Sequence, residues 1–230
     1  KIVYTIDPAD PRPFLHTMKI EFTKDDIKFV GTNGKSLSEY RVKNIYTLKE
    51  GIFLFRYDLL MCLRRAITEE GDVYFDLTDK FIMVKFQDFI LWGMNITGFT
   101  YPEYDTILNS YKHSIYLDKK VLLSCLFAFI DMFNPEDNNR LTMTIEDHKL
   151  RFRTSFVSSS IEQASFEYDY EVNYDGKFII DVDGRLLTSS IDAIKDEVIF
   201  LGFTDDNSVM ILDSNTYKDQ KAIVTHLKRR

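Results

Sequence analysis

The chain is poor in the residues that form linkers, crosslinks and membrane spans. Its 230 residues include nine glycines and five prolines, which leave little room for a long flexible linker. No apolar run approaches the roughly 20 residues that a membrane-spanning helix needs, and no signal-peptide pattern is present. The two cysteines, Cys62 and Cys125, fall inside predicted helices, where a reduced core thiol is the expected role. We therefore expect a cytoplasmic protein with no membrane partner.

Positive charge is also in deficit. Lys and Arg total 29 against 36 Asp and Glu, which gives a formal net charge of -7. This balance argues against a protein whose whole surface is built for nucleic acid. It leaves room for local basic faces, because Coulomb attraction depends on where the charges lie. The 19 Phe and 13 Tyr suit sheets, and the 45% hydrophobic residues are enough for the core of one large domain or two small ones.

The most informative pattern is a repeated one, seen in full in residues 51–97. An apolar run at 52–55 is followed by apolar residues at helical spacing over 57–67, and then by three alternating runs at 73–77, 81–86 and 89–96. The order strand, helix, three strands recurs twice downstream, and its second half recurs once upstream. The downstream helices are predicted over 118–133, with Asp118 as N-cap, and after an N-cap at Asp183 or Gly184.

This repetition predicts an α+β fold in which helices share one face of the molecule and antiparallel sheets form the other. An extended Tyr-Pro-Glu-Tyr connector within residues 98–110 divides the chain into domains 1–100 and 101–230. Residues 1–14 are predicted to be irregular and polar, because three prolines interrupt regular structure there. The first domain lacks the strand and helix of its front half, so we expect the chain to begin partway through a domain.

The sequence offers no convincing catalytic or metal site. Residues 31–36 look superficially like a phosphate-binding loop, but Phe29 stands where that loop requires glycine, and the following residues alternate as a strand. The four histidines lack metal-like spacing among themselves or with cysteine. The serines at 158–160 have no glycine elbow around them, and the acidic pairs at 25–26 and 205–206 fall in predicted turns. The hypothesis of a carbohydrate-active enzyme is supported only by the abundance of carboxylates. We therefore expect no enzymatic activity, metal or cofactor.

Basic residues on the predicted helices are more suggestive. They recur in all three copies of the repeated unit, at Arg64, Arg65, Lys119, Lys120, Arg185 and Lys195. For any one helix, an ordinary solvated face is an equally good interpretation. Their presence on three helices of an acidic protein favours a local positive strip. Such a strip would contact the phosphates of a nucleic acid without recognising its bases.

Four segments resemble the bacterial DNA polymerase III beta sliding clamp. They are Asp10-Pro11-Arg12-Pro13-Phe14-Leu15, then Met18-Lys19-Ile20-Glu21-Phe22, then the segment 29–37 (FVGTNGKSL) and the connector 98–104 (GFTYPEY). Each motif is loose alone, but their order and spacing together are fairly specific. The resemblance runs essentially end to end. It covers the family's second domain, without its first strand and helix, and the complete third domain.

The resemblance implies the DNA clamp fold and a processivity factor for DNA replication. Family members form a closed ring around duplex DNA from two copies of a three-domain chain, with helices lining the hole. Such a ring tethers the replicative polymerase, and it binds the polymerase, the clamp loader and repair proteins through short peptide motifs. Without the family's first domain, we expect this chain not to close a two-copy ring; a three-copy ring is the alternative. A clamp-fold interaction module that no longer encircles DNA is the alternative function.

The resemblance also implies site residues. The loop at Arg12, Pro13 and Phe14 would touch DNA. The peptide pocket would lie between the two domains and use Leu15, Thr32, Gly34, Lys35, Ser36, Leu37, Asn109, Asp183, Leu186, Ile223, Val224, Thr225, His226 and Leu227. Several positions depart from the family pattern: Lys35-Ser36 replaces His-Arg, Asn109 replaces proline, Asp183 and Leu186 replace Asn and Tyr, and residues 225–228 replace Met-Pro-Met-Arg. These departures predict a pocket that is poor or prefers a different peptide.

Overall fold

The computed structural model describes residues 1–43, 50–158, 161–205, 208–214, 216 and 219–227. Contacts divide the chain into two compact units. The first consists of Lys1–Gly34 and Glu39–Glu103, and the second of Lys35–Ser38 and Tyr104–Arg230. Within the described residues, no helix has the length and apolar character that crossing a membrane would require.

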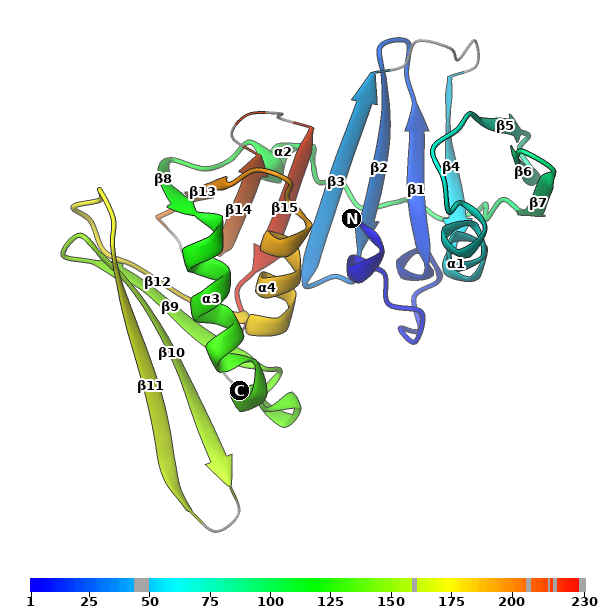
Figure 1. Cartoon of the computed structure of the whole chain (residues 1–230). Coiled ribbons are helices and arrows are strands. Elements are labelled where there is room, and N and C mark those ends of the chain that lie inside the picture. Colours follow the sequence, from blue (N-terminus) through cyan, green and yellow to red (C-terminus); the bar gives the residue numbers. More distant parts are fainter. Residues whose placement is uncertain (44–49, 159–160, 206–207, 215, 217–218, 228–230) are drawn as a thin grey trace. The chain divides into compact units, whose positions relative to one another are not determined.

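In its described residues, the first unit contains one α-helix and two groups of antiparallel strands (Figure 1). Two 3₁₀ turns, η1 (Val3–Thr5) and η2 (Pro13–His16), precede the strands. One sheet has the order β4-β1-β2-β3 and the other β5-β6-β7. The elements are β1 (Thr17–Phe22), β2 (Asp26–Thr32), β3 (Ser36–Lys43), β4 (Gly51–Arg56), α1 (Tyr57–Ala66), β5 (Val73–Leu77), β6 (Phe81–Phe86) and β7 (Phe89–Met94).

The second unit contains two full repeats. The first comprises β8 (His113–Asp118), α3 (Lys119–Phe129), the turns η3 (Ile130–Met132) and η4 (Pro135–Asp137), β9 (Arg140–Glu146), β10 (Lys149–Ser158) and β11 (Ile161–Glu171). The second comprises β12 (Phe178–Asp183), α4 (Gly184–Ala193), β13 (Val198–Phe203), β14 (Val209–Ser214) and β15 (Gln220–Thr225). The short helix α2 (Asp105–Leu108) precedes them. The strand orders are β15-β14-β13-β8 and β11-β10-β9-β12, so each repeat gives its first strand to the other repeat's sheet.

The alternation of buried and partly exposed residues shows where the core of the second unit lies. In β9, Leu141, Met143 and Ile145 are buried, while the intervening residues are partly exposed. In α3, Leu122, Cys125, Leu126 and Phe129 recur at helical spacing and join the same core cluster. The helices α3 and α4 lie side by side (Figure 1).

The predicted α+β architecture of strand–helix–three-strand repeats is confirmed, and Asp118 is the N-cap of α3, accepting a hydrogen bond from the Val121 amide at 2.9 Å. The strands and helix predicted within residues 51–97 begin and end within two residues of the predicted bounds, and the helix predicted over 118–133 ends at Phe129, where the turn η3 follows. A third strand is predicted from the sequence over residues 38–46, and its last three residues lie outside the described residues. The same holds for serines 159–160, for residue 206 of the predicted turn and for residue 228.

Three local expectations are wrong. Cys62 is exposed and is not a core thiol, because it lies off the apolar side of α1, whereas Cys125 is buried as predicted. The N-terminal segment is not simply irregular and polar: it forms η1 and η2, and Ile2, Ile6 and Leu15 are buried. The connector is not extended throughout, because Asp105–Leu108 forms one helical turn whose Leu108 is buried.

Neighbouring positions on α3 test this packing. Leu126 is fully buried, whereas the adjacent Phe127 is 51% exposed. We expect Leu126→Ala to lower the free energy of unfolding by about 2–5 kcal/mol, because it removes buried methyl groups and leaves a cavity. Phe127→Ala should change it by no more than about 0.5 kcal/mol. Urea unfolding followed by circular dichroism measures both, and equal losses would contradict this placement of α3.

Candidate nucleic-acid interface

The arginines of α1 point to solvent because the apolar residues of the helix face the sheets. Leu59 and Leu60 are 8% and 7% exposed. Leu59 packs over Gly93 of β7, where an added Cβ would lie 3.4 Å from a Leu59 methyl carbon. Arg64 and Arg65 fall in the last turn, and both are exposed. The helix dipole favours cations at this end, so α1 presents a stable pair of positive charges.

Lys119 is held by the neighbouring helix. Its ammonium donates to the backbone carbonyls of Asp192 and Ile194, at 2.9 and 2.5 Å. These carbonyls lie at the C-terminal end of α4, where backbone acceptors lack partners within the helix. The backbone amide of Lys119 also donates to the carbonyl of Glu197 at 2.8 Å. Lys119 therefore joins the start of α3 to the end of α4, a role that sequence reasoning missed because the partners are distant in the chain.

The other predicted cations of the second unit, Lys120, Arg185 and Lys195, are exposed. Lys120 lies on α3 and Arg185 on α4, but the placement of Lys195 on the helix is wrong, because α4 ends at Ala193. Arg185 Nη2 also donates to the carbonyl of Ile130 at 3.3 Å, which connects the start of α4 to the end of α3. Two of these three side chains lie beside the surface pocket described next.

A pocket of about 640 Å³ is lined by both α3 and α4, and its charge is mixed. Its lysines are Lys119, Lys120 and Lys195, and its acids are Asp118, Asp192, Asp196 and Glu197. Asp118 caps α3, while Asp196 is buried and accepts from the Ser214 hydroxyl at 2.8 Å. The acids offset the lysines, so this face attracts phosphate only weakly.

The loop at Arg12 is organised by an ion pair. Arg12 Nε and Nη2 donate to the two carboxylate oxygens of Asp10, at 2.8 and 2.9 Å. The guanidinium also lies against Gly34, whose φ is 81°, and an added Cβ there would meet Arg12 Nη2 at 3.0 Å. The hydrogen bonds from Arg12 lower the pKa of Asp10 to about 2.

The aromatic side of this loop is also fixed. The Arg12 guanidinium lies 6.0 Å from the ring centre of Phe14, and the Phe14 ring packs edge-on against Tyr101 at 6.3 Å. Arg12 itself is exposed, while Pro13 and Phe14 are half-buried. The loop therefore offers an exposed cation whose charge Asp10 partly neutralises.

In the first unit, the predicted peptide-pocket residues are mostly structural. Leu15 is fully buried and Thr32 is 6% exposed. The Thr32 hydroxyl accepts from the Gly34 amide at 3.1 Å, which fixes the turn between β2 and β3. Gly34 is exposed.

In the second unit, the predicted pocket residues divide into buried and accessible ones. Ser36, Leu37, Ile223, Val224 and Leu227 are buried, Leu186, Thr225 and His226 are half-buried, and Lys35 and Asn109 are exposed. The Lys35 carbonyl accepts from both the amide and the hydroxyl of Thr225, at 3.0 and 2.8 Å. His226 Nδ1 accepts from the Asp181 amide at 3.3 Å, which ties the end of β15 to β12.

Asp183 is the N-cap of α4. One carboxylate oxygen accepts from the amides of Arg185 and Leu186, at 3.0 and 3.2 Å. Burial raises the pKa of Asp183, although these amides and Asn139 act in the opposite direction. The position where the resemblance implies a pocket asparagine is thus occupied by an acid that caps a helix.

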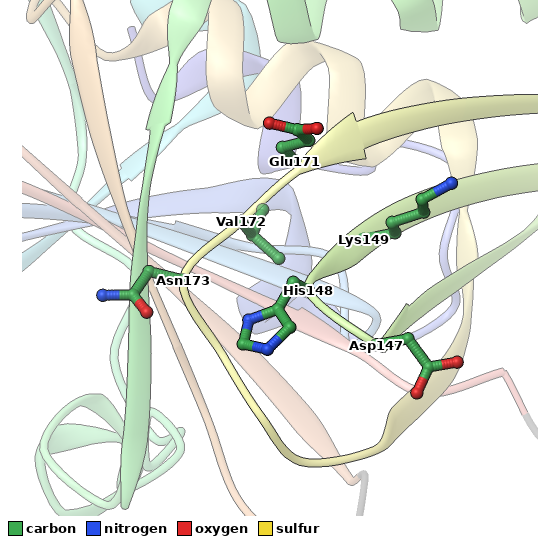
Figure 2. Close-up of a pocket in the computed structure, with 6 residues that line it drawn as sticks. All are labelled: Asp147, His148, Lys149, Glu171, Val172 and Asn173. Atoms are coloured by element: carbon green, nitrogen blue, oxygen red, sulfur yellow. The ribbon is translucent and has the colours of Figure 1, made fainter.

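A further pocket, of about 520 Å³, lies at the turn between β9 and β10 and was not predicted (Figure 2). Its lining residues are Asp147, His148, Lys149, Glu171, Val172 and Asn173. Asp147 and His148 both have positive φ, as a tight hairpin turn requires. The Val172 amide donates to the His148 carbonyl at 2.7 Å. In the described part of the chain, no three His, Cys, Asp or Glu side chains are grouped as metal ligands would be.

No protein-family model and no curated protein matches the sequence. The fold is similar to solved bacterial structures: the DNA polymerase III subunit beta from Pseudomonas aeruginosa at 18% identity, a putative DNA polymerase III beta subunit from Eubacterium rectale at 16%, and the DNA polymerase sliding clamp from Caulobacter crescentus at 16%. The TM-score is 0.87 in each case. These likenesses cover 99%, 98% and 100% of this chain, and 62%, 61% and 62% of the others.

The chain therefore has the fold of the bacterial beta sliding clamp, as the resemblance predicted, and it spans about 62% of the length of the structures it matches. At these identities the likeness concerns the fold. The roles of the individual cations and pocket residues stay predictions.

Variants of Lys119 and Lys120 test whether Lys119 has a structural role that Lys120 lacks. We expect Lys119→Met to lower the free energy of unfolding by about 1–2 kcal/mol, because it removes a charged donor from the end of α4. Lys120→Met should stay within about 0.5 kcal/mol. Thermal unfolding of both variants is the measurement, and an unaffected Lys119→Met protein would rule out the link between α3 and α4.

The ion pair at Arg12 can be tested by titration. In Arg12→Ala the pKa of Asp10 should rise from about 2 toward ~4, its ordinary value, and in Arg12→Lys it should rise less. Because the folded-state pKa is lowered, the pair stabilises the loop above pH ~4 and that contribution disappears as pH falls toward 2. Carboxyl NMR during an acid titration reads the midpoint directly. If Asp10 titrates with the same midpoint in the parent protein and in Arg12→Ala, the two residues are not paired in solution.

Proposed function

We propose that this chain acts as a DNA sliding clamp, a processivity factor that encircles duplex DNA and tethers the replicative polymerase. The observation that carries the proposal is the match of nearly the whole chain to bacterial clamp structures at a TM-score of 0.87. Because the chain spans about 62% of those structures, ring assembly is part of the proposal. The distribution of its surface charges gives independent support.

The charge pattern suits a ring that slides. A closed ring retains DNA by topology and needs only weak contacts that salt screens, because strong phosphate contacts would hold it in place. The chain is acidic overall, at -7, yet its helices expose Arg64, Arg65, Lys120 and Arg185, and Lys195 is exposed just after α4. A few cations on helices of an acidic protein would guide the backbone of DNA without reading its bases.

Partner proteins would bind through short peptides. In the second unit, five members of the predicted pocket have side chains that solvent reaches: the half-buried Leu186, Thr225 and His226 and the exposed Lys35 and Asn109. A few apolar anchors with a polar rim suffice for such recognition. The proposed partners are the polymerase, its clamp loader and repair proteins.

One observation favours an alternative, a clamp-fold interaction module that does not encircle DNA. The lysines beside α3 and α4 share their pocket with four acids, and Lys119 is bonded to backbone carbonyls. The lysines beside α3 and α4 are thus more closely accompanied by acids than Arg64 and Arg65, which lie together in the last turn of α1.

Charge reversal on α1 distinguishes the two functions. In the clamp, Arg64→Glu with Arg65→Glu should weaken DNA binding, and the slope of log K against log salt should become shallower by about 0.9 for each lost phosphate contact. Fluorescence anisotropy with duplex DNA across a salt series measures this. Lys85→Glu, an exposed position on β6, is the matched control and should leave the slope unchanged.

Retention on DNA provides the second measurement. A clamp stays on nicked circular DNA through gel filtration and is lost when the circle is cut, since only topology holds it. The interaction module would show no difference between circular and linear DNA, and the α1 double variant would bind as the parent does. That pair of results would exclude the sliding-clamp proposal.

A further inference from the structure

His226 is held by its backbone and by one nitrogen of its ring. It directly follows β15, and its amide donates to the carbonyl of Ser208 at 3.0 Å. Its Nδ1 accepts from the Asp181 amide at 3.3 Å. A backbone N–H can only donate, so Nδ1 carries no proton and the proton of the neutral imidazole lies on Nε2. This bond therefore sets both the orientation and the tautomer of the ring.

The amide of Asp181 is itself firmly placed. Asp181 lies opposite Thr142 in the pairing of β12 with β9. Its side chain is 4% exposed, and its carboxylate accepts from Arg140 Nη1 at 3.0 Å and from the Thr142 hydroxyl at 2.6 Å. Its carbonyl accepts from the Leu227 amide at 2.7 Å. Asp181 thus bonds two successive residues at the end of β15, and its own charge is already matched by Arg140.

The second ring nitrogen of His226 remains available to a ligand. The side chain is half-buried. Among the residues that the structure describes, Nε2 has no hydrogen-bond partner, and it is not one of the buried polar atoms, so solvent reaches it. His226 therefore presents an N–H donor at the surface. In a peptide pocket, apolar anchors supply most of the affinity, whereas a placed donor of this kind supplies specificity.

The charge beside His226 favours an acidic ligand group. The carbonyl of Lys35 accepts from both the amide and the hydroxyl of Thr225, which places Lys35 next to this end of β15. Lys35 is exposed, and its Nζ donates to the amide side chain of Asn138 at 3.0 Å, a contact that does not cancel its charge. A carboxylate at Nε2 would form a charge-assisted hydrogen bond when the imidazole is protonated and would be attracted by Lys35 in either state.

We propose that His226 is a specificity-determining residue of the peptide pocket, and that it selects partner peptides with an acidic side chain at the position that meets Nε2. The inference rests on the proposed function, because it names the class of peptide that the same pocket takes. The carboxylate accepts the Nε2 proton, and apolar side chains of the peptide contact the accessible part of Leu186. Residues 225–228 depart from the family pattern, so this preference belongs to this chain.

Selection from a random library tests the preference without assuming a sequence. The probe is a library of octapeptides displayed on phage and selected on the immobilised full chain. Enriched peptides should carry Asp or Glu at one fixed position several-fold more often than unselected peptides. Selection on His226→Phe should keep the apolar positions and lose the acidic one, because Phe retains a flat ring without a donor. His226→Gln keeps an N–H donor and should restore part of the preference.

Affinities of one selected peptide measure the contact. In fluorescence anisotropy with the labelled synthetic peptide, replacing its acidic residue by the corresponding amide should weaken binding to the parent about tenfold. On His226→Phe the two peptides should bind equally. Lys35→Met should weaken the acidic peptide a few-fold and leave the amide peptide unchanged. Lys177→Met removes an exposed lysine that pairs with Glu146; it is the matched control and should change neither affinity.

Nitrogen-15 NMR of the His226 ring reports the contact directly. In the free protein at about pH 8.5, the proton of the neutral ring should lie on Nε2. Saturating acidic peptide should shift the Nε2 resonance and leave the resonance of Nδ1, which stays bonded to Asp181, nearly unchanged. Circular dichroism checks that each variant is folded.

Three results would overturn the proposal. The first is a set of selected peptides without an acidic position. The second is an acidic preference that persists in His226→Phe. The third is a library that yields no binding peptide, which would mean that the pocket does not take peptides. Retention on nicked circular DNA involves no peptide, so this inference and the encirclement of DNA can fail separately.

Discussion

The second unit depends on the exchange of strands between its two repeats. β8 comes from the first repeat and pairs with β13 of the second, and β12 comes from the second and pairs with β9 of the first. Neither sheet is complete without the other repeat, and the core cluster draws residues from both. The helices that follow the exchanged strands are brought together by the same arrangement, and Lys119 joins them at one end. The contact of Lys119 with the end of α4 therefore depends on this exchange.

Local sequence patterns predicted the elements well, because each pattern reports a local preference. The alternation in β9, the helical spacing of Leu122, Cys125 and Leu126, and the N-cap at Asp118 all act within a few residues. The exposure of Cys62 was also accessible from the sequence, since the apolar positions of α1 define a side on which it does not lie. The resemblance to clamps supplied the fold family, which neither composition nor periodicity could give.

What the sequence could not give depends on contacts between distant residues. The role of Lys119 requires the end of α4, more than seventy positions away in the chain, to lie beside it. The neutralisation of Arg12 by Asp10 is local, but its packing against Gly34 depends on how the loop folds onto β2. Likewise, the bond that orients the His226 ring requires the end of β15 to lie beside β12, and an alternating run does not specify its neighbour. Charge counts on predicted helices therefore overestimate the free positive charge.

The interlocking of the two repeats also affects how the second unit tolerates a broken backbone. The segment between β11 and β12 links the repeats covalently, but the hydrogen bonds of β8 with β13 and of β12 with β9 hold them together independently of that link. A cut there would leave two fragments that each carry a strand needed by the other. The fragments would reassemble as a non-covalent pair, and the same site would suit new chain termini in a circular permutant.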